Sequence, residues 1–152
     1  PRYGANSGKE NPDFLNYDLW LEQVGEPFLD KRILERTGAL VFQFPRFDTR
    51  RVPAAEFYER LAEFLSLLPP ELKYAVEIRN PELITPEYVG ILNETEVTHC
   101  FNQWDSMISP VDQMRAIAAG GGLTAPLLVG RFLTPLGYSY EAAGKLLEPY
   151  TA

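Results

Sequence analysis

The chain has little cysteine and little histidine, and it has fewer basic than acidic side chains. Its single cysteine, Cys100, cannot form an intrachain disulfide, which favours a reducing, cytoplasmic setting. Its single histidine, His99, gives little support to a Ser-His-Asp triad, a two-histidine zinc site or a Cys-His pair. We therefore expect neither a metal nor another cofactor.

The charge balance and the hydrophobic pattern make further classes of protein poor candidates. Against 21 acidic side chains there are only 14 basic ones, a formal net charge of -7. Such a balance disfavours nonspecific binding to nucleic acids and to anionic membranes. No apolar run of about 18 residues and no signal-peptide pattern is present, so we expect neither a membrane span nor secretion.

Short apolar runs alternate with amphipathic segments along the chain, after a loop-like opening stretch over 1–12. Apolar runs predict buried strands, and apolar residues at spacings of three and four predict helices. The predicted strands cover 39–44, 74–78, 97–102 and 126–132. The predicted helices cover 13–24, 54–68, 85–92, 110–119 and 139–148, with Thr85 and Ser139 as N-caps.

Strands separated by helices predict parallel pairing with right-handed connections, and their close spacing favours a TIM-like α/β barrel. The alternative is a flavodoxin-like open sheet, but the glycine-rich phosphate turn that usually accompanies it is absent. Four strand-helix units make half of an eight-strand barrel. We therefore expect residues 1–152 to form a single domain, part of a barrel that N-terminal strands upstream of Pro1 or an oligomer would complete.

Polar residues are expected where the strands end, because barrel sites form at the carboxyl ends of strands. In the segment 74–81, alternation places Glu77 and Arg79 on one face. Such a pair could be catalytic, with Glu77 as a base, a metal ligand or an orienting group and Arg79 as an anion clamp. The alternative is a structural ion pair that braces the barrel mouth.

Other strand ends and one loop supply the candidate ligand-binding residues, which are Gln43, Asn102, Trp104, Arg131 and Lys9. Together they would suit a small polar or anionic molecule. For each one a purely structural role is at least an equal alternative, and it is the favoured one for Trp104, as packing, and for Lys9, as a solvated loop position.

Two further residues are expected to be structural. His99 alternates with Cys100 and Asn102, which places it on the outer face of its strand, against a helix. Cys100 lies on the inward face among apolar neighbours, so we expect it to be buried and unreactive.

Four segments carry a resemblance to a known family: Gly38–Pro45, Phe64–Pro70, Tyr74–Pro81 and Tyr138–Ala142. In them the chain resembles the YecE-like family, catalogued as domain of unknown function seventy-two. The resemblance implies a TIM-like barrel with Gln43, Glu77, Arg79 and Arg131 at its polar rim. The chain departs from the family where it has Asn80-Pro81-Glu82-Leu83, since a His-Pro-Ser-Trp type of sequence often stands there.

The leading functional hypothesis is a barrel protein that binds a small polar or anionic ligand, with hydrolase or lyase chemistry as the candidate reaction. Whether it is an enzyme stays open. One alternative is a nucleic-acid-binding or endonuclease-like barrel, which the net charge of -7 disfavours. Another is a non-catalytic structural or interaction module.

Overall fold

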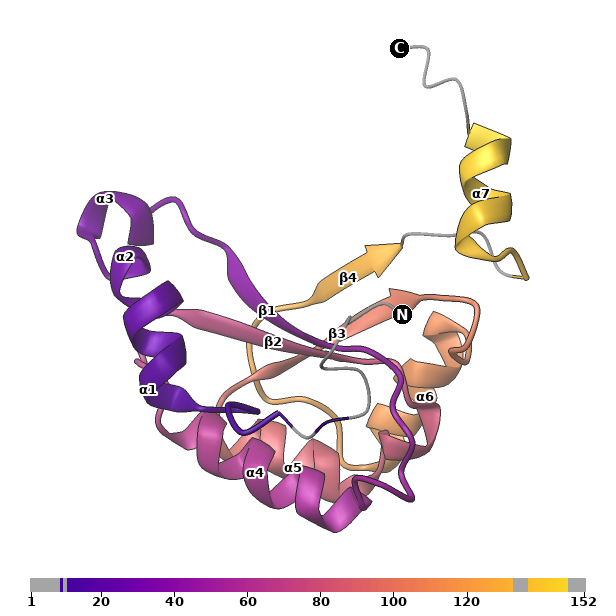
Figure 1. Ribbon diagram of the computed structural model, residues 1–152, viewed down its shortest axis with the longest axis horizontal. Helices are drawn as coiled ribbons and strands as arrows, with labels where there is room; N and C mark the ends of the chain where they lie inside the picture. The colour runs from indigo at the N-terminus through magenta and orange to yellow at the C-terminus, as the bar shows by residue number, and fades with distance from the viewer. Residues whose placement is uncertain (1–8, 10, 133–136, 148–152) are drawn as a thin grey trace.

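A computed structural model describes residues 9, 11–132 and 137–147. Its centre is a curled sheet of four parallel strands, in which each strand pairs with the next one along the chain (Figure 1). The strands are β1 (Ala39–Phe44), β2 (Lys73–Ile78), β3 (Thr98–Gln103) and β4 (Val129–Phe132). The predicted fold class, a partial parallel α/β barrel, is confirmed.

Three helices connect consecutive strands and lie in a row along one face of the sheet (Figure 1). They are α4 (Ala54–Ser66), α5 (Pro86–Glu94) and α6 (Pro110–Ala119). The predicted cap of α5 is present, since Thr85 Oγ1 accepts a hydrogen bond from the backbone N–H of Tyr88 at 3.2 Å. A short 3-10 turn, η3 (Pro81–Leu83), precedes this cap.

The N-terminal helical segment differs from the predicted helix over 13–24. It runs through α1 (Tyr17–Trp20), a π-helical turn η2 (Leu21–Gly25) and α2 (Glu26–Phe28), and the short α3 (Lys31–Leu34) follows. The predicted start was wrong because Leu15 has a φ of 58°, which is not helical.

The predicted end at residue 24 was also wrong, because the helical turns continue through Gly25 to Phe28. This glycine packs beneath Trp20, where a Cβ atom would lie 2.8 Å from the indole ring. It is therefore a close-packing position and not a helix stop. The π-helical turn, which relaxes the usual hydrogen-bond ladder, directly precedes the segment with Pro27, whose nitrogen has no hydrogen to donate.

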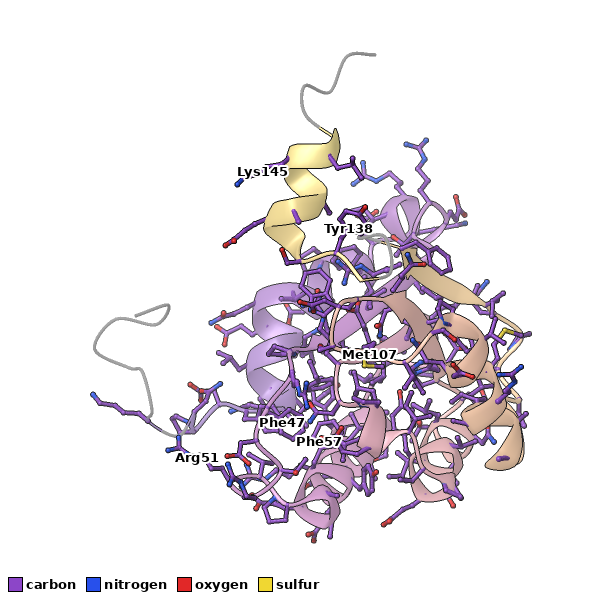
Figure 2. All side chains as sticks on the ribbon, turned by 90° about the vertical axis from the view of Figure 1, so that its right-hand side faces the viewer. Phe47, Arg51, Phe57, Met107, Tyr138 and Lys145 are labelled. Carbon is purple, nitrogen blue, oxygen red and sulfur yellow. The ribbon has the colours of Figure 1, made fainter. Side chains whose placement is uncertain are left out.

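The core lies between the sheet and the row of helices and is rich in aromatic rings. Phe42 of β1 meets Phe64 of α4 with ring centroids 5.0 Å apart. Phe57 of α4 lies 5.2 Å from Phe44 and 5.3 Å from Phe47, the latter pair lying side by side in Figure 2. Because alternate residues of each strand enter this core, the remaining ones line the opposite, inner face of the sheet.

The last unit is less covered than the others. β4 is shorter than the predicted strand; Leu128, just before it, and Phe132, at its end, are 77% and 66% exposed. The final helix, α7 (Tyr140–Leu147), lies beyond the carboxyl end of β4 and apart from the row of helices, as Figures 1 and 2 show. Its predicted cap is present, since Ser139 Oγ accepts a hydrogen bond from the N–H of Ala142 at 3.2 Å.

Some predictions fall on residues that the structure does not describe. They are the end of the last helix at Glu148 and all of the opening loop except residues 9, 11 and 12. Within the described ranges, no helix has the length and the apolar character that crossing a membrane requires.

Candidate functional site

A buried carboxylate is the centre of the inner face. Glu77, one residue before the end of β2, is completely buried. Arg79 follows on the same face, and its Nε donates a hydrogen bond to Glu77 Oε1 at 3.0 Å. The structure thus brings together the acid and the guanidinium that two-residue alternation placed on one face.

A second guanidinium reaches the same carboxylate from β4. Arg131 Nη1 donates to Glu77 Oε2 and also to Gln43 Oε1, the latter at 2.7 Å. Gln43 lies directly opposite Glu77 in the register of β1 and β2. Both oxygens of the carboxylate are therefore bonded to guanidinium groups, and the cluster carries two positive charges and one negative charge.

Trp104 holds one of the two arginines in place. The guanidinium carbon of Arg79 lies 3.9 Å from the centre of the tryptophan ring. A cation over an aromatic face is attracted to it, and the contact restricts rotation of the arginine side chain. Between the ring and Glu77, Arg79 keeps a defined orientation with 12% of its side chain exposed.

The other two candidate residues differ in their placement. Asn102 pairs with Arg131 in the register of β3 and β4, so both residues lie on the inner face. Lys9 is exposed in the loop before α1 and takes no part in the hydrogen bonds around Glu77. The structure therefore assembles all the strand-end candidates on the inner face and leaves the loop lysine outside.

A buried hydrogen-bond network lies behind the site, between β3 and the helices. The His99 Nδ1 atom is 3.0 Å from the hydroxyl of Tyr88 on α5, and its Nε2 atom is 3.3 Å from Gln113 Oε1 on α6. The prediction that His99 faces the helices is confirmed. Burial lowers the pKa of His99 to about 4, against the opposing effect of its hydrogen bond to Gln113 Oε1.

Gln113 is a residue that the sequence analysis missed. Its Oε1 accepts from the backbone N–H of Asn102 at 3.1 Å, and its Nε2 donates to the carbonyl of Asn102 at 2.6 Å. It thereby fixes the carboxyl end of β3 from the helix side. One sequence feature could have indicated it. Gln113 lies one helical turn before the apolar Ile117, on the core face of α6, and a buried polar residue requires a hydrogen-bond partner.

Cys100 is fully buried on the inner face, as predicted. Burial, together with the negative charge of Glu77, raises the pKa of its thiol to about 11, although Arg131 acts in the opposite direction. Almost none of the thiol is then in the reactive thiolate form near neutral pH.

We expect Cys100 of the native protein to react with an aromatic disulfide reagent at least about a hundredfold more slowly than the unfolded chain does. The absorbance of the released thiolate measures the rate. As a control, Ser66→Cys adds a thiol at an exposed position of α4 and should react at once. Equal rates for the native and the urea-unfolded protein would contradict the expected burial.

Within the described residues, no group of three or more histidine, cysteine, aspartate or glutamate side chains is arranged to hold a metal ion. The features that define this chain are a curled parallel α/β sheet of barrel type and a charged cluster at the carboxyl ends of its strands.

The comparison with protein families agrees with this class of structure. A family model described as "Protein of unknown function DUF72" matches residues 19–149, so the chain belongs to this family. No curated protein and no solved structure matches the chain.

Proposed function

We propose that the protein binds a small anionic ligand on the inner face of the sheet, at the carboxyl ends of its strands. The observation that supports this most is the charge of the cluster. Arg79 and Arg131 share the one carboxylate of Glu77, which leaves an excess positive charge in a chain whose net charge is -7. A positive site on an acidic protein favours small anions over extended polyanions.

The geometry of Arg79 supports the same proposal. Its Nε is used by Glu77, while no acceptor from the described part of the chain bonds either of its terminal Nη groups. These groups can therefore donate two parallel hydrogen bonds to a carboxylate or a phosphate. Because Trp104 and Glu77 already fix the side chain, little conformational entropy is lost when the ligand binds.

The roles follow from these contacts. Glu77 orients the two guanidinium groups, since both of its oxygens are occupied by them. For hydrolase or lyase chemistry, Arg79 and Arg131 would stabilise the negative charge that develops on a ligand oxygen. Gln43 holds the second arginine toward the first.

A thermal-shift screen tests this proposal. A ligand at a hundred times its dissociation constant adds about 2.7 kcal/mol of stability, and for a chain of this size that corresponds to a rise in Tm of roughly 5–10 °C. We expect such a rise with phosphate or with members of a panel of small carboxylates, compared with chloride at equal ionic strength. We expect no rise for Arg79→Met or Arg131→Met.

The matched control is Arg115→Met, which removes an arginine from the exposed face of α6 and should leave the ligand response intact. Ligand shifts of equal size in Arg79→Met and in the unaltered protein would overturn the proposal. Stabilisation by single-stranded or duplex DNA, without a response to small anions, would favour the nucleic-acid alternative instead.

A further inference from the structure

Asn102 contains an unusual buried atom. The residue is 1% exposed, and its Nδ2 donates a hydrogen bond to the carbonyl of Ile78 at 3.0 Å. This bond fixes the orientation of the amide, because only the nitrogen can donate. The other amide atom, Oδ1, is buried and has no hydrogen-bond partner among the residues that the structure describes.

An unpartnered buried acceptor destabilises the folded state, and native proteins seldom keep one without a reason. Local relaxation does not easily remove it here. Gln113 bonds both the N–H and the carbonyl of Asn102, so the backbone that carries the side chain is held on its helix side. Asn102 Oδ1 is therefore an acceptor whose position is already fixed before any donor binds to it.

This acceptor lies between the two arginines of the cluster. Asn102 pairs with Arg131 across β3 and β4. On the side of β2, Asn102 Nδ2 bonds the carbonyl of Ile78, the residue directly before Arg79. Neighbouring strands are about 4.8 Å apart. The acceptor thus lies on the strand between the two that carry the guanidinium groups.

We propose that the ligand of this site carries a hydroxyl group close to its anionic group, and that Asn102 Oδ1 accepts the hydrogen bond from that hydroxyl. This inference rests on the proposed function, since the arginines must hold the anion. The spacing of one strand fits a hydroxyl group on the carbon next to a carboxylate, or one a few bonds from a phosphate. Hydroxy acids and phosphorylated polyols share this chemistry.

The experiment compares ligands that differ only in the hydroxyl group. Isothermal titration calorimetry would measure glycolate against acetate, and glycerol phosphate against propyl phosphate, so that the carboxylate and phosphate sources are distinguished. We expect the hydroxylated member of at least one pair to bind about tenfold more tightly. In Asn102→Ala this preference should fall to about twofold or less.

Asn93→Ala is the matched control. Like Asn102, Asn93 bonds the backbone through its side chain, at Gly122 and Thr124, but it is only partly buried and lies on α5, away from the inner face. The variant should keep the full preference. The comparison within the unaltered protein does not depend on whether Asn102→Ala folds.

The outcomes separate the two proposals. Equal binding of both members in both pairs would overturn the role of Asn102 while leaving the anion site standing. A preference that persists in Asn102→Ala would also overturn it. If no member of either pair binds, the proposed function itself fails, and this inference fails with it.

Discussion

Replacing Glu77 with glutamine should lower the free energy of unfolding by about 3 kcal/mol, since breaking a buried ion pair leaves its partners uncompensated. The substitution keeps the shape of the side chain but leaves Arg79 and Arg131 with no negative partner between them. Urea denaturation measures the change. The control is Glu56→Gln, which breaks an exposed pair with Arg60 on α4 and should cost less than about 0.5 kcal/mol.

The same substitution tests whether acid and guanidinium act as one unit. In a double-mutant cycle of Glu77→Gln and Arg79→Met, we expect the combined loss to be smaller than the sum of the separate losses by at least about 1 kcal/mol. The reason is that each residue is costly to bury alone. Separate losses that add to within about 0.5 kcal/mol would show that the two side chains are independent, whatever their distance.

Stability should also depend on pH through His99. Its pKa is about 4 in the folded protein and near 6.5 in the unfolded chain. Between these values the unfolded chain binds a proton that the native state does not, so the free energy of unfolding falls as the pH falls. The contribution of neutral His99 to the free energy of unfolding is fully present above pH 6.5. Roughly 3 kcal/mol of that free energy is lost by pH 4.

Urea denaturation at a series of pH values measures this loss, and His99→Gln is the comparison. The variant should have a shallower slope between pH 6.5 and 4, even if it is less stable overall. Carboxylates with lowered pKa values, such as Asp30 and Asp48, are exposed, and we expect them to respond alike in both proteins and to cancel in the difference. Parallel curves would mean that His99 is not buried in its neutral form.

The sequence predicted the repeating strand-helix units because burial on both faces makes a strand an unbroken apolar run. The predicted bounds of β1 and of α6 match those observed. The first helix was mispredicted because its apolar spacing begins before Asn16, whose side chain caps the real start. Nothing in local periodicity indicates the φ of 58° at Leu15 or the close packing at Gly25.

For the candidate site, sequence periodicity was informative only within a strand. It placed Glu77 beside Arg79, two positions apart. The contact between Glu77 and Arg131 depends on the curl of the sheet across β3, which no local pattern encodes. The unpartnered oxygen of Asn102 likewise depends on how its amide is oriented by the carbonyl of Ile78.

Gln113 on α6 bonds the backbone of Asn102. The position of Asn102 on the inner face therefore depends on the helix layer as well as on its neighbours in the sheet. A substitution on α6 that shifts this helix by a few tenths of an ångström would carry the amide of Asn102 with it. If the inner face binds a ligand as proposed, its preference would therefore differ among relatives whose inner-face residues are identical, through changes in the helix layer. Substitutions on the core face of α6 would then change ligand selectivity without touching the ligand. A mutant library restricted to the residues at the strand ends would not include them.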